Sequence, residues 1–111
     1  MEKFTVGSVV LVSFPFSNLK GKKIRPTLVL AKAEFDNLVL CQITSKPYAS
    51  KSAIRIESTD FEEGNLPVIS YIRPDKLFTA ENTIIEKTAG KLTEKSLNAA
   101  LQIVKNLFTL E

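Results

Sequence analysis

The chain has 111 residues, of which 44% are apolar, and it carries 15 Lys and Arg against 12 Asp and Glu, a net charge of +3. This length predicts one domain spanning residues 1–111 around a single core. No apolar run approaches the roughly 20 residues that span a bilayer, and the first residues lack the apolar core of a signal peptide, so we expect a cytoplasmic protein without a membrane partner.

Histidine is absent and cysteine occurs once, as Cys41. These counts exclude a His-based general base, a Ser–His triad, an internal disulfide and a zinc site with His ligands, and they predict no metal site. Cys41 lies inside an apolar run, which indicates a buried structural thiol rather than a reactive one.

Short runs rich in Val, Ile and Leu, bounded by Gly, Pro or Asn, are typical of strands. They predict strands at Val9–Phe14, Thr27–Lys32, Leu38–Thr44, Ala53–Ile56, Val68–Ile72 and Thr83–Lys87. We expect Pro15 to end the first strand and Gly90 to end the last one. We also expect Lys76–Phe78 to extend the fifth strand after Pro74. The acidic stretch Asp60–Pro67 is predicted to be a loop.

The last part of the chain predicts a helix that starts at Thr93, whose hydroxyl can cap the first turn. Its apolar residues follow the spacing of one helix face: Leu97, Ala100, Leu101, Val104, Leu107 and Phe108. Several short strands and one late helix predict a mainly β protein with a C-terminal helix, built as a small, strongly curved sheet or barrel.

Three places carry polar side chains that could act on a phosphate. Arg25 precedes Pro26, which favours an extended backbone, so the guanidinium would project from the mouth of the second strand. Thr44 ends the third strand, and its hydroxyl could contact a phosphate oxygen or help move a proton. Arg73 and Asp75 are two residues apart and would share a face, where the guanidinium lowers the pKa of the carboxyl group. The alternatives are an exposed edge arginine, a turn hydrogen bond and a surface ion pair.

Several motifs together resemble the PemK/MazF-like toxins of bacterial toxin–antitoxin pairs. GSVVLVSFPF from Gly7, a short basic loop and RPTLVLA from Arg25 resemble the opening of that family. Ile43-Thr44-Ser45, Ser70–Phe78 and Gly90-Lys91-Leu92 follow in the family's order. The resemblance spans nearly the whole chain. It implies an SH3-like barrel of the PemK/MazF (CcdB-like) toxin type, closed by the C-terminal helix and usually dimeric.

The resemblance also implies an activity, that of a metal-independent endoribonuclease and toxin of a type II toxin–antitoxin pair. Such an enzyme cleaves single-stranded mRNA without a cofactor, by attack of the 2′-hydroxyl on the adjacent phosphate to give a 2′,3′-cyclic phosphate. Arg25 would stabilise the phosphate charge, Arg73 would assist or act as the acid, and Asp75 would be the base, directly or through Thr44. Both the Arg–Thr pair and the Arg–Asp pair stay open as the proton-transfer groups. A cognate antitoxin would cover the same groove.

A second set of residues would contact the RNA outside the reacting phosphate: Phe16, Lys20, Lys22, Lys23, Ser45, Lys46 and Tyr48. The lysines would attract phosphates, Tyr48 could stack on an unpaired base, and Phe16 could line the groove. The plainer alternative is that these are ordinary loop residues.

Two other functions remain open at this point. The same barrel could bind a protein such as DNA gyrase without catalysis, as a related toxin family does, although the tail 106–111 lacks the Trp-Gly pair expected for it. It could also be an RNA-binding module that has lost its activity.

Overall fold

The computed structural model describes residues 4–15, 22–46 and 51–109, with the backbone alone at positions 14, 15 and 22. The strands of this part form one antiparallel sheet in the order β4-β6-β3-β2-β1-β7-β5. They are β1 (Ser8–Pro15), β2 (Lys22–Lys32), β3 (Asn37–Thr44), β4 (Ile54–Ile56), β5 (Phe61–Gly64), β6 (Ser70–Glu81) and β7 (Ile85–Leu92). The 3₁₀ turns η2 (Ser58–Asp60) and η3 (Asn82–Ile84) and the helix α1 (Glu94–Asn106) complete the described elements.

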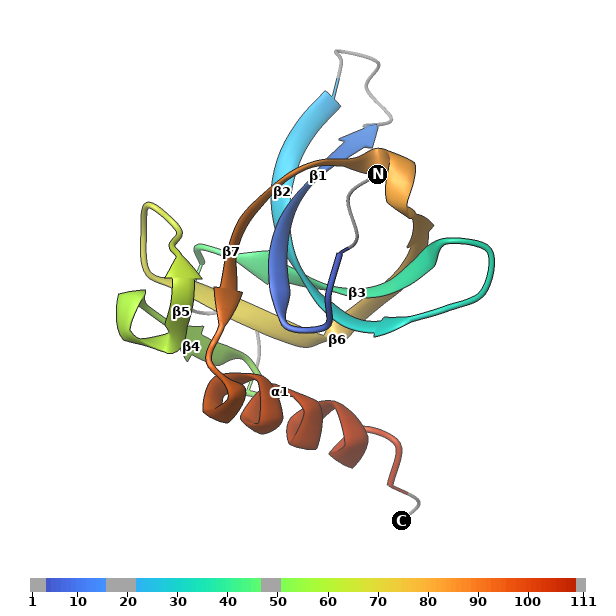
Figure 1. The fold of residues 1–111 in the computed structure, drawn as a ribbon. Helices are drawn as coiled ribbons and strands as arrows, with labels where there is room; N and C mark the ends of the chain where they lie inside the picture. The colour runs from blue at the N-terminus through green and yellow to red at the C-terminus, as the bar shows by residue number, and fades with distance from the viewer. Residues whose placement is uncertain (1–3, 16–21, 47–50, 110–111) are drawn as a thin grey trace.

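The sheet curls on itself into a half-barrel, and α1 lies along one side of it (Figure 1). The two edge strands, β4 and β5, follow each other in the chain and are separated only by residues 57–60. A sheet whose opposite edges are joined by so short a connection has to bend until the edges come near each other. The predicted mainly β fold with a C-terminal helix is therefore confirmed.

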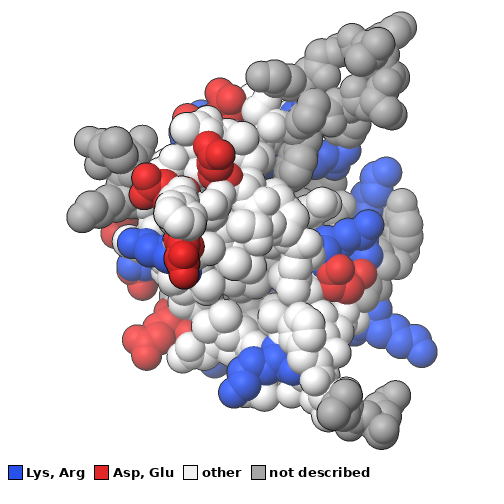
Figure 2. Space-filling model, turned by 90° about the vertical axis from the view of Figure 1, so that its right-hand side faces the viewer, with Lys and Arg blue, Asp and Glu red and all other residues white. Residues whose placement is uncertain are grey.

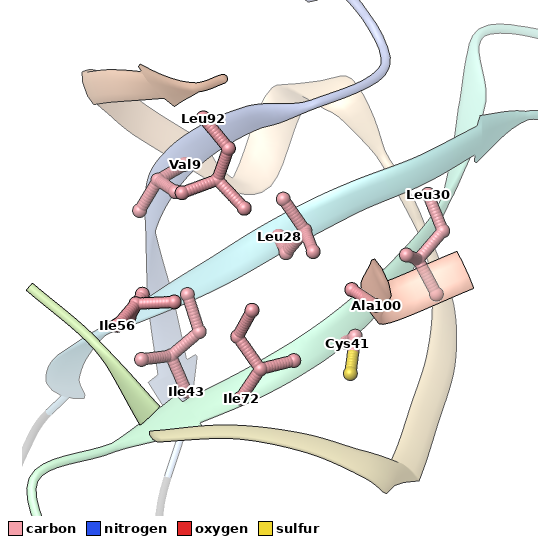
Figure 3. Close-up of a cluster of buried hydrophobic side chains, with 9 residues drawn as sticks. All are labelled: Val9, Leu28, Leu30, Cys41, Ile43, Ile56, Ile72, Leu92 and Ala100. Atoms are coloured by element: carbon pink, nitrogen blue, oxygen red, sulfur yellow. The ribbon is translucent and has the colours of Figure 1, made fainter. Parts of the chain in front are cut away.

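Apolar residues fill two cores because consecutive side chains of a strand point to opposite faces of the sheet. On one face, Val9, Leu28, Ile43 and Ile72 meet, and Ala100 of α1 covers them (Figure 3). On the other face the cluster consists of Val10, Val12, Val29, Leu38 and Leu40, with Phe78 and Ile85 packed against it. Neighbouring residues such as Val9 and Val10 thus belong to different cores, which explains why the strand sequences are almost continuously apolar.

β1 ends at Pro15, as expected, and β6 continues past Pro74 through the predicted extension Lys76–Phe78. β1 includes Pro15, which pairs with Lys22, so β2 begins at Lys22 and Arg25 lies inside the strand instead of at its mouth. β6 runs through Pro74 without a break, because its register against β3 shifts there and a proline is tolerated in a bulge. Val68 and Ile69, predicted as strand, precede β6 and are exposed.

A strand lies where an acidic loop was predicted, since β5 pairs with β7 and forms an edge of the sheet. β7 continues through Gly90, which was expected to end it, and Thr83 falls in η3 instead. A Cβ atom at Gly90 would lie 2.5 Å from the Glu63 carbonyl oxygen and 2.9 Å from the Phe61 ring. Glycine at this position therefore permits the close approach of β5 to β7.

Helix α1 begins as the sequence predicts, because the Thr93 hydroxyl accepts the backbone N–H of Ser96 at 3.2 Å. Ala100 is fully buried, and Leu101 and Val104 pack on the same core. Leu107 and Phe108 lie beyond the helix and are 44% and 71% exposed, so the packed face is shorter than predicted.

We expect Gly90→Ala to lower the free energy of unfolding by about 1–3 kcal/mol, the usual cost of forcing extra volume into a packed site. The reason is the contact with the Glu63 backbone, which cannot move aside as a flexible side chain could. Urea denaturation followed by circular dichroism measures it. Thr88→Ala, at an exposed position of the same strand, is the matched control. Equal midpoints for both variants and the parent protein would contradict this explanation of Gly90.

Candidate functional site

The register between β2 and β3 brings Arg25 next to Thr44. Leu28 pairs with Cys41 and Thr27 with Gln42, and continuing this antiparallel register by two residues sets Arg25 opposite Thr44. Directly opposed residues in a sheet have Cβ atoms about 4.5–5.5 Å apart. The paired ladder itself ends at Thr27 and Gln42, so this register directs Arg25 and Thr44, 19 positions apart in the chain, to the same end of the sheet.

The same row continues across the next two strands. Thr44 pairs with Tyr71 of β6, and Tyr71 pairs with Arg55 of β4. Thr44, Tyr71 and Arg55 each alternate with a core residue, because Ile43, Ile72 and Ile56 point to the opposite face. The row, which we call the polar row, therefore consists of Arg25, Thr44, Tyr71 and Arg55 and crosses β2, β3, β6 and β4.

Arg73 and Asp75 form a two-pronged ion pair beside this row. The Arg73 Nε donates to Oδ1 of Asp75 at 3.0 Å, and Nη2 donates to Oδ2 at 2.7 Å. The pair is only partly shielded, with side-chain exposures of 19% and 38%. Arg73 follows Tyr71 by two residues in β6, so it shares the face of Thr44 one diagonal step away. The hydrogen bonds from Arg73 lower the pKa of the Asp75 carboxyl group, which keeps it ionised.

The thiol of Cys41 holds the backbone from which this ion pair projects. β6 contains extra residues against β3, because Ile72 pairs with Ile43 while Leu77 pairs with Cys41. In that bulge the Cys41 thiol donates to the Arg73 carbonyl oxygen at 2.8 Å. Cys41 is fully buried, and burial, together with the charge of Asp75, raises the pKa of its thiol to about 12. The predicted buried structural thiol is confirmed.

A cleft of about 640 Å³ opens at the end of the sheet where β2 begins and β3 ends. Arg25, Thr44 and Ser45 line it, together with Lys87 of β7 and residues 65–68 between β5 and β6. The ion pair is not among the described residues that line this cleft. The structure thus joins Arg25, Thr44 and Ser45 in one cleft, and the ion pair lies outside this cleft, on the face of β6 that carries Tyr71.

The hydroxyl of Thr44 already takes part in a turn, since its Oγ1 accepts the backbone N–H of Lys46 at 3.2 Å. This is the alternative that the sequence left open for a polar residue at a strand end. The contact uses one lone pair and leaves the hydroxyl hydrogen free to be donated. The turn bond is therefore compatible with a role toward a phosphate, because it orients the hydroxyl.

The structure describes some of the predicted RNA-contacting residues and not others. Lys23, Ser45 and Lys46 are exposed near the cleft-forming ends of β2 and β3. Phe16, Lys20 and Tyr48 lie outside the described residues, and Lys22 is described by its backbone only. The roles of all these residues stay predictions.

Sequence reasoning missed two residues at this site. Lys87 adds a second cation to the cleft lining, and no local sequence signal marks it. Tyr71 was part of a motif but had no role, although the alternation of Tyr71, Arg73 and Asp75 with buried residues could have placed all three on one face.

Charged residues are unevenly distributed over the surface. On the face shown in Figure 2, most Lys and Arg lie toward one margin, most Asp and Glu lie toward the other, and an uncharged area separates them. Within the described ranges, no group of three or more His, Cys, Asp or Glu residues could hold a metal ion. In the same part of the chain, no helix has the length and apolar character needed to cross a membrane.

We expect Arg73→Gln to raise the pKa of Asp75 toward the ordinary aspartate value, because the hydrogen bonds that stabilise its charged form are lost. Carboxyl ¹³C chemical shifts followed against pH measure it. The native pKa is the lowered one, so the contribution of the pair to stability is present above the unfolded pKa and disappears as the pH falls through the native pKa. Arg55→Gln, which removes a different ion pair, should leave Asp75 unchanged. An unchanged pKa in Arg73→Gln would show that the ion pair does not persist in solution.

Comparison with known proteins identifies the family. Residues 5–108 match the family model described as PemK-like, MazF-like toxin of type II toxin–antitoxin system. No curated protein sequence matches the chain.

Among solved structures, the chain is similar to the MazE–MazF complex from Deinococcus radiodurans, with a TM-score of 0.75, 17% identity and coverage of 96% of both chains. It is also similar to the Mycobacterium tuberculosis toxin MazF-mt6, with a TM-score of 0.72, 17% identity and coverage of 94% of this chain and 98% of that one. A mycobacterial endoribonuclease solved with its cognate antitoxin has a TM-score of 0.72 at 15% identity, over 100% of this chain and 98% of the other. At these identities the structural likeness concerns the fold. The match of the family model over nearly the whole chain shows that this protein belongs to the PemK-like, MazF-like toxins of type II toxin–antitoxin systems.

Proposed function

We propose that this protein is the endoribonuclease toxin of a type II toxin–antitoxin pair and cleaves single-stranded RNA in the cytoplasm without a metal ion. The observation that carries the proposal is that Arg25 and Thr44 line one cleft, while the Arg73–Asp75 pair lies outside that cleft on β6, the strand that pairs with Thr44. Similar folds are described as endoribonucleases and as toxins in complex with an antitoxin. We also propose that the protein forms a homodimer and that a cognate antitoxin binds over the cleft.

The reaction begins when the 2′-oxygen of a ribose attacks the adjacent phosphorus. A bond from the 2′-oxygen to phosphorus forms, the bond from phosphorus to the 5′-oxygen breaks, and a 2′,3′-cyclic phosphate results. Arg25 supports the extra negative charge of the five-coordinate phosphate, because a guanidinium donates two parallel hydrogen bonds to phosphate oxygens.

The proton of the 2′-hydroxyl passes to Asp75, directly or through the Thr44 hydroxyl. The departing 5′-oxygen takes a proton from water or through Thr44. The hydrogen bond with Asp75 raises the pKa of Arg73, which makes it a poor proton donor. We therefore assign Arg73 to orienting Asp75 and to stabilising charge rather than to acid catalysis.

Arg25→Ala should lower the rate of RNA cleavage by about 10²- to 10³-fold, as for the loss of one transition-state donor. The assay incubates mixed-sequence RNA with the protein in EDTA and maps the ends for cyclic phosphate and 5′-hydroxyl. Lys32→Ala removes one positive charge from the far end of the same strand and serves as the matched control. Intact RNA with the parent protein would overturn the proposal, and inhibition of DNA supercoiling alongside it would favour a gyrase-binding toxin.

Two further variants separate the candidate proton-transfer groups. If Asp75 is the base, Asp75→Asn should lower kcat strongly at every pH near neutrality, because its lowered pKa keeps it ionised throughout that range. Thr44→Val keeps the shape and removes the hydroxyl. A larger loss of kcat in Thr44→Val than in Asp75→Asn would assign proton transfer to the Arg25–Thr44 pair instead.

A further inference from the structure

Tyr71 lies in the middle of the polar row and has no part in the reaction described above. It pairs with Thr44 on one side and with Arg55 on the other. Its neighbours in the chain, Ser70 and Ile72, are buried, whereas Tyr71 is partly exposed on the opposite face. An aromatic ring is thus fixed one strand away from the hydroxyl that would meet the reacting phosphate.

Arg55 lies beside Tyr71 on the edge strand β4. Its Nη1 donates to Oε2 of Glu57 at 2.6 Å, which orients the guanidinium on the same edge of the sheet. The pKa of Arg55 is raised, first by this hydrogen bond and by the charge of Glu57. Arg55 and Tyr71 are directly opposed on β4 and β6, so the oriented guanidinium lies beside the tyrosine.

The chemistry of the neighbours indicates what could lie on the ring. Adjacent strands are about 4.8 Å apart, so the distance from Arg25 to Arg55 across the row is about 14 Å. A strand of RNA that crosses β2, β3 and β6 would bring a phosphate to Arg25 and Thr44 and an adjoining base over Tyr71. Every base offers a π face, and stacking on an aromatic ring does not depend strongly on base identity.

We infer that Tyr71 is a base-stacking residue, which holds the nucleotide next to the reacting phosphate by contact between its ring and an unpaired base. The inference rests on the proposed ribonuclease function and adds to it a residue that fixes the position of the substrate. Tyr71 transfers no proton, so its ring and not its hydroxyl carries the effect.

The sequence allows this contact to be observed directly, because it contains only two tyrosines, Tyr48 and Tyr71. In the full-length Tyr48→Phe protein labelled with 3-fluorotyrosine, the single ¹⁹F resonance belongs to Tyr71. The probe is a mixed-sequence 2′-fluoro RNA oligonucleotide, which lacks the attacking hydroxyl and is not cleaved. Stacking predicts a saturable ring-current shift of this resonance with the same Kd as anisotropy gives for that protein.

The second measurement is the affinity of Tyr71 variants for the same RNA probe. Tyr71→Leu should weaken binding by about 5- to 150-fold, the range for loss of one stacked base, while Tyr71→Phe should bind like the parent. Phe35→Leu, which changes an 87%-exposed aromatic residue in the turn between β2 and β3, is the matched control and should have no effect.

Each outcome separates the inference from the function on which it rests. If the parent protein binds the probe but the resonance does not move and Tyr71→Leu binds equally well, the stacking role is wrong and the ribonuclease proposal stands. If Tyr71→Phe loses as much affinity as Tyr71→Leu, the hydroxyl is what matters, and the stacking role is again wrong. If the parent protein does not bind the probe at all, both proposals fail. If Tyr71→Leu does not fold, the ¹⁹F resonance shift and the affinity of Tyr71→Phe still test the stacking role.

Discussion

The hydrogen-bonding register of β3 against its two neighbours determines which side chains meet in this molecule. β3 lies between β2 and β6: it pairs Thr44 with Tyr71, and its register against β2 directs Arg25 to the cleft that Thr44 lines, although the three come from distant parts of the chain. A slip of one residue in either pairing would turn the whole strand over and exchange its core side chains for its polar ones. The apolar residues on the opposite face, among them Ile43 and Ile72, therefore fix the polar row through their burial.

A local irregularity in this regular sheet positions the remaining polar pair. β6 bulges against β3 next to the two hydrogen bonds between Arg73 and Asp75, and there the Cys41 thiol donates to the Arg73 carbonyl oxygen. The single cysteine of the chain thus has a structural task. Burial and a pKa of about 12 keep its thiol protonated, which a hydrogen-bond donor requires.

The charges of the site suit a reaction that has to stabilise a phosphate without a metal ion. Arg25 and Lys87 supply positive charge at the cleft, and the Arg73–Asp75 pair supplies an ionised carboxylate held in one orientation. The proposed reaction uses these groups at the phosphate, whereas Tyr71 would act on the base. Because the phosphate and the base would be bound at different places along the row, loss of the aromatic ring should lower RNA affinity more than the rate of cleavage.

The sequence by itself determined the kinds of side chain available and most of the local structure. Strand content, the Thr93 cap, the buried thiol and the family resemblance all followed from patterns within a few residues, because local backbone preferences depend on near neighbours. A local pattern failed at Gly90, where pairing with β5 outweighs the residue's own tendency to end a strand. Local patterns also failed at Phe61–Gly64, whose acidic composition concealed an edge strand. Only the tertiary structure decided that Lys87 lines the cleft and that Tyr71 lies beside Thr44, because both depend on strand register and on the curl of the sheet. These are set by contacts between residues far apart in the chain.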